Sequence, residues 1–328
     1  MSLFAPALSS TWKQIEDAGL DPEPLFLSHG IRKSEIFDPN ARVSAAQVDR
    51  VVAEAMAEIR DPFFGLREAD YFRPAHLGSL GFAWLASSNL LEAFRRLNRY
   101  SRVINDKLEI ALEEGADTIR ISVREQRPSA DPYQRDAGCL AVLVRMCRFI
   151  CGDGWNPVHV SVAHPEPPDA SYFYAYFRCP VMFGAEANAL EIDTRQAGER
   201  IAGANEYLAQ LNDHIVVRYI AHRSREDIVS RVRAAVLDSL GDGQITEKAV
   251  ASQLNMSARQ LNRRLKDENT SFRSLLMECR RELAEQYLSD SSLSLTEISY
   301  LLGFSESSSF SRAYRRWTGR SPTEARGT

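Results

Sequence analysis

The last third of the chain repeats one hydrophobic pattern twice: a short helix, a turn and a second, amphipathic helix. In the later repeat, residues 294–317, Ser294 and Glu297 have the spacing of a capping box, in which each side chain binds the other residue's backbone N–H. Gly303 is expected to end the first helix, because glycine adopts a left-handed turn at little cost. The apolar positions recur at helical spacing and predict one buried stripe, made of Leu295, Ile298, Leu301 and Leu302.

A second helix is expected to follow, with Ser305 as its N-cap. Its apolar face consists of Phe310, Ala313, Tyr314 and Trp317. Its remaining surface carries short hydroxyl side chains and guanidinium groups, at Ser308, Ser311, Arg312, Arg315 and Arg316. A helix with one apolar face packed on the core and an exposed cationic face fits the major groove of DNA. Taken alone, the pattern is equally typical of an ordinary exposed basic helix.

The earlier repeat, residues 246–266, has the same organisation. A turn is expected at Asn255–Met256, and Ser257 with Gln260 at box spacing starts the second helix. Leu261 and Leu265 are expected to face inward. The outward positions are polar and mostly positive, at Arg259, Asn262, Arg263 and Lys266. Because the arrangement occurs twice, an ordinary surface helix becomes the weaker interpretation.

Helical spacing continues without a break between the two repeats. Its apolar positions are Phe272, Leu275, Leu276, Cys279, Leu283 and Tyr287. A helix of about eighteen residues would be about 27 Å long. Such a spacer could hold two recognition helices about 34 Å apart, which is one turn of DNA.

From about Thr246 to Arg326 the chain resembles the AraC/XylS family of transcription regulators. The resemblance is carried by Ala251, Leu254, Met256-Ser257, Arg259, Leu261, Arg263-Arg264-Leu265, Ser271-Phe272, Arg280, Ala284, Ile298, Leu301-Gly303-Phe304-Ser305, Phe310, Arg312, Ala313, Arg316-Trp317, Gly319 and Ser321-Pro322. It implies a bipartite domain with two helix-turn-helix units that binds double-stranded DNA. Four positions depart from the family pattern without removing a polar group from the proposed DNA face: Asn269, Ser299, Ser307 and Ala325.

Carried over by position, the resemblance implies a set of base-reading residues in each unit. They are Arg259, Asn262 and Arg263 in the first, and Ser307, Ser308, Ser311 and Arg312 in the second. Activation is the family's commoner mode, which would make RNA polymerase a partner.

The first 200 residues mix helical and alternating patterns. Residues 1–60 are expected to be helical, and residues 107–124 alternate around 114–117 as a β-hairpin. Further helices are expected at 89–104, 133–151 and 172–177, with strands at 158–162 and within 181–192. The chain is therefore expected to be multi-domain, with an α+β N-terminal sensor or dimerisation domain (1–203), a linker helix (204–223) and an all-α C-terminal domain (224–328) with two helix-turn-helix units.

The N-terminal half also resembles a known domain, the arabinose-binding-like domain of one branch of the same regulators. The resemblance covers residues 61–100, His164-Pro165, Pro180 to Gly184 and Leu190, whereas the usual proline-containing run near Ala197 is absent. It implies effector sensing or dimerisation and no catalysis.

A small-molecule effector is the hypothesis for this half. Aromatic side chains could line its pocket, among them Phe63, Phe64, Tyr71, Phe72, Phe82, Trp84, Trp155, Tyr172, Phe173, Tyr174, Tyr176 and Phe177. Arg67, Arg73 or Arg178 could bind a carboxylate, so an anionic metabolite is favoured.

The linker helix carries an apolar stripe of its own, at Leu208, Leu211, Ile215, Tyr219 and His222. It could dock on its own domain or pair with a second copy in a homodimer. Docking on its own domain is the preferred expectation.

Composition and charge indicate the class of protein and how its charge is distributed, but they point to no particular chemistry. At 328 residues, 44% hydrophobic and 26% charged, the chain is a typical globular protein, and without a long apolar run it is expected to be cytoplasmic with no membrane contact. Residues 224–328 hold 16 Lys/Arg and 14 Asp/Glu, which leaves 24 and 30 for the rest of the chain. The positive charge of a DNA-binding domain must therefore be concentrated on one face.

No enzyme chemistry, cofactor or metal site is expected. The sequence has no phosphate-binding glycine loop, no HExxH and no metal-ligand spacing. Its five cysteines include no CxxC pair, and Cys147 and Cys151 are expected to pack in a core.

Overall fold

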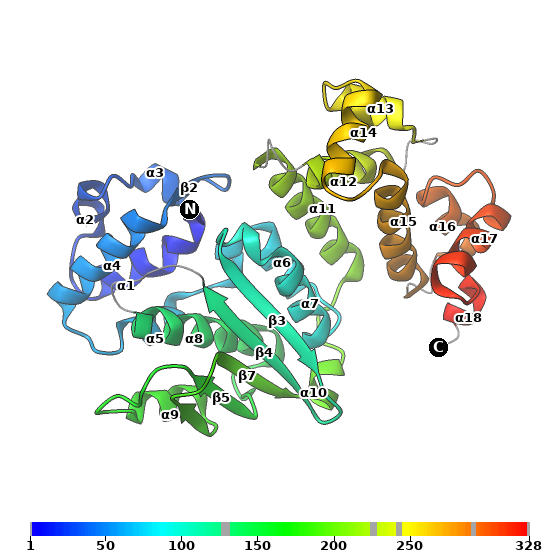
Figure 1. Cartoon of the computed structure of the whole chain (residues 1–328). Coiled ribbons are helices and arrows are strands. Elements are labelled where there is room, and N and C mark those ends of the chain that lie inside the picture. Colours follow the sequence, from blue (N-terminus) through cyan, green and yellow to red (C-terminus); the bar gives the residue numbers. More distant parts are fainter. Residues whose placement is uncertain (1, 126–131, 224–227, 241–244, 290–292, 327–328) are drawn as a thin grey trace. The chain divides into compact units, whose positions relative to one another are not determined.

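The division between the two halves lies inside one helix. The computed structural model describes residues 2–125, 132–223, 228–240, 245–289 and 293–326 (Figure 1). Contacts separate the chain into unit 1, Met1–Val216, and unit 2, Val217–Thr328. The boundary falls within α11 (Glu206–Arg223), the expected linker helix, so the first part of this helix belongs to unit 1.

Unit 1 is built on a five-stranded sheet with the strand order β3-β4-β7-β5-β6. The strands are β3 (Leu108–Glu114), β4 (Thr118–Glu125), β5 (His159–Val162), β6 (Val181–Phe183) and β7 (Asn188–Asp193). Neighbours are antiparallel except for β5 and β6. Along β4 the buried side chains alternate at Ile119, Ile121 and Val123, as the period of two predicts. The α+β fold and the hairpin are confirmed.

Helices cover this sheet and frame the rest of unit 1. They are α5 (Phe64–Tyr71), α6 (Ser79–Leu85), α7 (Leu90–Tyr100), α8 (Pro132–Cys151), α9 (Ser171–Phe177) and α10 (Thr194–Gly198), with short 3-10 turns η2 (Pro74–Leu77) and η3 (Ser101–Val103). Figure 1 shows α5 and α8 next to each other. Their backbones touch, because a Cβ on Gly65 would lie 2.1 Å from the carbonyl oxygen of Gln134. The contact also uses a hydrogen bond of 2.7 Å from the Gly65 N–H to Gln134 Oε1.

The first sixty residues form a helical cluster with a small sheet that the sequence did not predict. The helices are η1 (Ala5–Leu8), α1 (Ser9–Asp17), α2 (Pro22–Ser28), α3 (Lys33–Ile36) and α4 (Ala45–Ile59). Strands β1 (Ser2–Phe4) and β2 (Arg42–Ser44) pair antiparallel. Each has only three residues, too few for an alternating pattern to stand out.

In its described residues, unit 2 consists of helices joined by turns and loops. It contains α12 (Ile228–Ser239), α13 (Glu247–Gln253), α14 (Ala258–Asp267), α15 (Phe272–Ser289), α16 (Leu295–Leu301), α17 (Ser307–Thr318) and α18 (Pro322–Arg326). In Figure 1, α15 stands between the pair α13–α14 and the pair α16–α17. One hydrophobic cluster runs through all of them and includes Val232, Leu261, Cys279, Ile298 and Phe310. The 18-residue spacer helix and the two helix-turn-helix units are confirmed.

Two local expectations are corrected by burial. Cys147 is buried in α8 as expected, but Cys151, at the last position of that helix, is exposed. Leu301 is 40% exposed at the end of α16, because Ile298, Ser299 and Leu302 supply the side of that helix that packs on the core. No helix in the described part of the chain is long and apolar enough to cross a membrane.

Candidate nucleic-acid interface and ligand pocket

The first helix-turn-helix unit has the local geometry that its sequence predicts. Asn255 adopts a left-handed conformation with φ 57°, which turns the chain between α13 and α14. Ser257 caps α14, since its Oγ accepts from the Gln260 N–H at 3.2 Å while its own N–H donates to Gln260 Oε1 at 2.9 Å. These bonds satisfy N–H groups that an uncapped helix leaves unpaired.

All four candidate residues of α14 lie on its exposed side. Leu261 and Leu265 are fully buried behind them. The exposed residues are Arg259, Asn262, Arg263 and Lys266, which recur three and four positions apart and therefore share one face.

Asn262 has a partner that sequence reasoning missed. Its Nδ2 donates to Glu247 Oε1 at 2.6 Å, and Glu247 is the first residue of α13. An acid suits the start of a helix, where the helix dipole is positive. A separation of fifteen residues gives no periodic signal for this contact.

The second helix-turn-helix unit is also capped and turned as expected, with one correction. Ser294 and Glu297 form the predicted capping box, and Gly303 has φ 69°. The N-cap of α17 is Glu306 rather than Ser305, because the Glu306 carbonyl oxygen accepts the first helical bond, from the Ser309 N–H at 3.1 Å. Ser305 lies one residue before this N-cap, outside the helix.

The candidate residues of α17 are all at or near the surface. Phe310, Ala313 and Tyr314 are buried, and Trp317 is half-buried against the same core. Among the candidates, Ser307 and Ser311 are half-buried, and the exposed ones are Ser308, Arg312, Arg315 and Arg316. Two of these side chains already make hydrogen bonds within the protein, since Ser308 Oγ donates to Glu306 Oε2 and Arg312 Nη2 donates to Ser309 Oγ.

Arg280 of the spacer helix supports this second unit from behind. Its Nε donates to the Leu302 carbonyl oxygen at 2.9 Å, and its Nη2 donates to the Gly303 carbonyl oxygen at 3.0 Å. The guanidinium also lies 4.4 Å from the Phe304 ring centre. The last carbonyl groups of a helix lack partners within it, so this side chain fixes the turn before α17. Burial lowers the pKa of Arg280 from its ordinary value.

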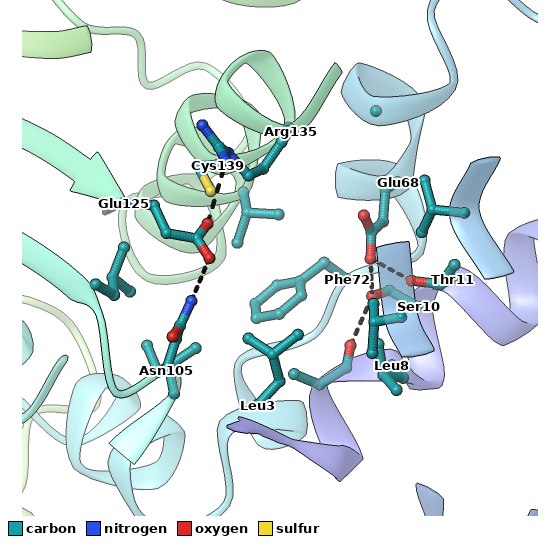
Figure 2. Close-up of a pocket in the computed structure, with 18 of the residues that line it drawn as sticks. Leu3, Leu8, Ser10, Thr11, Glu68, Phe72, Asn105, Glu125, Arg135 and Cys139 are labelled. Carbon is teal, nitrogen blue, oxygen red and sulfur yellow. Dashed lines mark hydrogen bonds and ion pairs between the residues drawn. The ribbon is translucent and has the colours of Figure 1, made fainter. Parts of the chain in front are cut away.

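Unit 1 contains a pocket of about 250 Å³, referred to below as the large pocket. Residues from η1, α1, α4, α5, α8, β3 and β4 line it, and most of these side chains are apolar. Figure 2 shows Phe72 in the middle, with Glu68, Ser10 and Thr11 on one side and Glu125, Asn105 and Arg135 on the other. The arrangement is typical of a small-molecule site, a mainly apolar hollow with a few convergent polar groups.

The two carboxylates of the large pocket are held in different ways. Glu68 Oε1 accepts from Ser10 Oγ at 2.8 Å and from Thr11 Oγ1 at 2.7 Å. Burial raises the pKa of Glu68 above its ordinary value. Glu125 accepts a hydrogen bond from Asn105 Nδ2 and lies 3.6 Å from the Nε of Arg135.

The residues expected from the sequence mostly lie outside the large pocket. Of the aromatic candidates only Phe64 and Phe72 line it, and none of the three candidate arginines does. Arg67 pairs with Asp61 at 3.0 Å, and Arg73 donates to backbone carbonyl groups. Arg178 borders a second hollow of about 210 Å³. Glu68, Glu125 and Arg135 come from three separate elements, so no sequence spacing joins them.

The linker helix packs on unit 1 through a different face from the one expected. Its buried residues are Ala209, Asn212, Asp213 and Val216. Asp213 Oδ2 accepts from Arg96 Nε of α7 at 2.9 Å, with both side chains largely buried. Three residues of the apolar stripe are left outside, with Leu208, Leu211 and Ile215 each 44% to 46% exposed, and Tyr207 beside them is 74% exposed. The side of α11 that faces the domain thus carries a buried ion pair together with Ala209 and Val216.

Among the described residues, no group of three His, Cys, Asp or Glu side chains is placed to hold a metal ion.

Comparison with known proteins covers both units. Residues 19–201 match the family described as the arabinose-binding domain of AraC transcription regulators, and residues 250–328 match a helix-turn-helix domain family. The ornithine utilization regulator of Pseudomonas aeruginosa is 30% identical over 315 residues, which cover 95% of this chain and 92% of that protein. The regulator VirS of Mycobacterium tuberculosis is 28% identical over 317 residues, with coverage of 95% and 92%.

A solved structure shares the fold over the whole length. The crystal structure of the transcriptional regulator CdpR from Pseudomonas aeruginosa covers 97% of this chain and 98% of its own, with a TM-score of 0.52 and 22% identity.

Proposed function

This chain belongs to the AraC family of transcription regulators, and we propose that it is an activator controlled by a small molecule bound in the large pocket of unit 1. In this proposal α14 and α17 enter successive major grooves on one face of the duplex. The observation that carries it is the joint occurrence of two exposed cationic helices on one shared core with a mainly apolar pocket in the other unit.

The arrangement of unit 2 supports two-point DNA binding. An 18-residue helix is about 27 Å long, which is close to the separation of two major grooves on one face of DNA, about 34 Å. Both recognition helices pack against the core that α15 runs through, so they would bind as one rigid body.

Control by a ligand would pass through α11. This helix begins in unit 1, where the Arg96–Asp213 ion pair holds it, and ends in unit 2. A ligand that binds one conformation of unit 1 better than another would shift the population of that conformation. The relative named for ornithine utilization favours a metabolite as the effector.

A homodimer is part of the same proposal. The exposed stripe of α11, formed by Tyr207, Leu208, Leu211 and Ile215, offers a helical apolar surface for the same stripe of a second copy. Activation would add RNA polymerase as a partner, and a protein that acts on the chromosome of a bacterium works in the cytoplasm.

A second candidate function is regulation without an effector. The exposed stripe on α11 favours it specifically, because a unit 1 that serves assembly needs such a surface. In that case the large pocket would stay without a physiological ligand.

The experiment that tests the proposal is footprinting of the full-length protein on DNA that flanks its own gene, at fixed salt, with and without pools of small metabolites. We expect two protected segments one helical turn apart, and a change in affinity or protection with one pool. Specific binding that ignores every pool would support the second candidate, and no specific binding would contradict both.

A further inference from the structure

The large pocket has an excess of acidic side chains. Its charged lining residues are Asp49, Glu68, Glu125 and Arg135, so three carboxyl groups face one guanidinium. Arg135 is itself close to two acids, since it lies 3.6 Å from Glu125 and 2.8 Å from Asp136. The positive charge in the wall is therefore already balanced at the β4–α8 side of the pocket.

Glu68 differs from the other pocket acids. In the part of the chain that the structure describes, no Lys, Arg or His side chain lies within ion-pair distance of its carboxyl group. Its contacts are the two hydroxyl donors Ser10 and Thr11, and both of these bonds go to the same oxygen, Oε1. A buried carboxylate is costly without an opposite charge.

From this geometry we propose that the large pocket takes an organic cation, a protonated amine that pairs with Glu68 and lays an apolar body against Phe72 and Leu8. The inference rests on the proposed role of this pocket as the effector site and names the chemical class of the ligand. An ammonium group can donate to the carboxylate at charge-assisted strength while the hydroxyl bonds remain.

The size of the pocket limits the ligand. A cavity of 150 Å³ holds benzene, so a pocket of about 250 Å³ suits a ligand of about ten non-hydrogen atoms. The apolar wall, which includes Leu3, Leu8 and Phe72, excludes a compact ion without a hydrocarbon part. An amine with a short aliphatic or phenylalkyl body meets both conditions.

The acidic side of the pocket also argues against the anion suggested by the sequence. A carboxylate placed beside Glu68 would meet a like charge in a site of low dielectric. Arginines that could bind an anion, Arg145, Arg148 and Arg178, border the second hollow instead.

The test uses three probes of one shape, phenylpropylamine, phenylpropanol and phenylpropanoate, with calorimetric titration of the full-length protein at neutral pH. We expect the amine to bind about tenfold or more tightly than the alcohol, and the carboxylate to bind weakest, as a charge-assisted bond predicts. Equal or tighter binding of the alcohol or the carboxylate, or no binding of any probe, would overturn the proposal.

Variants assign the effect to one side chain. Glu68→Gln keeps an oxygen that can accept from Ser10 and Thr11, and it should reduce amine affinity to that of the alcohol. Glu58→Gln, at an exposed position of α4, is the matched control and should leave all three affinities unchanged. An amine preference that survives Glu68→Gln would also overturn the proposal. If the variant folds poorly, the comparison of the three probes on the unchanged protein still tests the proposal.

DNA affinity measured in the same samples distinguishes the proposed cation site from the proposed control of DNA binding by an effector. Amine binding that depends on Glu68 without any effect on DNA binding would support the cation site and contradict effector control. A change in DNA affinity caused by an anionic or neutral metabolite, and not by an amine, would support effector control and contradict the cation site.

Discussion

The guanidinium of Arg280 donates to the carbonyl oxygen of Leu302 over 2.9 Å, so the spacer helix holds the turn of the second helix-turn-helix unit directly. The companion bond to the Gly303 carbonyl oxygen uses the other arm of the same planar group. Both acceptors lie in the segment that sets the direction of α17, so the position of α17 depends on a side chain of α15.

Arg280→Lys should therefore loosen this turn although it keeps the charge. A lysine cannot donate in a planar fork or stack on Phe304 in the same way. We expect a cost of about 1.5–3 kcal/mol, the range for hydrogen bonds to charged groups. Amide exchange at Gly303 and Phe304 measures it, with Arg281→Lys at an exposed position of α15 as the control. Unchanged exchange at both amides would rule out the supporting role.

Arg263→Ala and Arg312→Ala test base reading by α14 and α17. Each should cost about 1–3 kcal/mol of binding free energy and relax the preference at one base position. Competition binding with single-base variants of the operator measures both quantities. A loss that is equal for all sequences, with a salt slope lower by about one, would assign the residue to a phosphate instead.

The control for these substitutions is Arg50→Ala, an exposed arginine of α4 in unit 1. It should change neither the preference nor the salt slope. Arg316→Ala is expected to behave as a phosphate contact, because Arg316 is exposed near the C-terminal end of α17, whereas the N-terminal residues of a recognition helix contact base edges.

Leu211→Asp tests the proposed dimer. Leu211 is 45% exposed in the middle of the α11 stripe, and burying a leucine contributes about 1.5–3 kcal/mol. The substitution should shift the protein toward the monomer in sedimentation experiments. Leu27→Asp, at a leucine of α2 that is 58% exposed, is the matched control. A variant that sediments like the unchanged protein would show that α11 is not the interface.

Glu68 should make the stability of unit 1 depend on pH. Burial raises its pKa in the folded state above the ordinary value of 4.5, so between these two pKa values the folded protein holds a proton that the unfolded chain has released. Stability should therefore fall as the pH rises through this window, by at most about 1.4 kcal/mol per pH unit for one proton.

The measurement is urea unfolding at a series of pH values, compared between the unchanged protein and Glu68→Gln. The variant should show a flatter profile and a higher stability at neutral pH. Asp213 also has a raised pKa, chiefly through burial, and it keeps its contribution in both proteins. Identical profiles for the two proteins would mean that Glu68 does not titrate in this way.

The sequence by itself determined the elements whose cause is local. The capping boxes of Ser257 with Gln260 and Ser294 with Glu297, and the turn at Gly303, depend on residues within four positions of one another. The β3–β4 hairpin and the α15 spacer follow from simple periods of two and 3.6. Such features need no knowledge of distant parts of the chain.

Only the tertiary structure decided the large pocket and the orientation of α11. Glu68, Glu125 and Arg135 meet because α5, β4 and α8 pack around one hollow, and their separations along the chain encode no pattern. The buried face of α11 carries Asp213, whose partner Arg96 is 117 positions away in the sequence, whereas hydrophobicity alone would bury Leu208, Leu211 and Ile215. Contacts between distant elements depend on how whole layers pack, and the hydrophobic pattern of one helix cannot specify its partners.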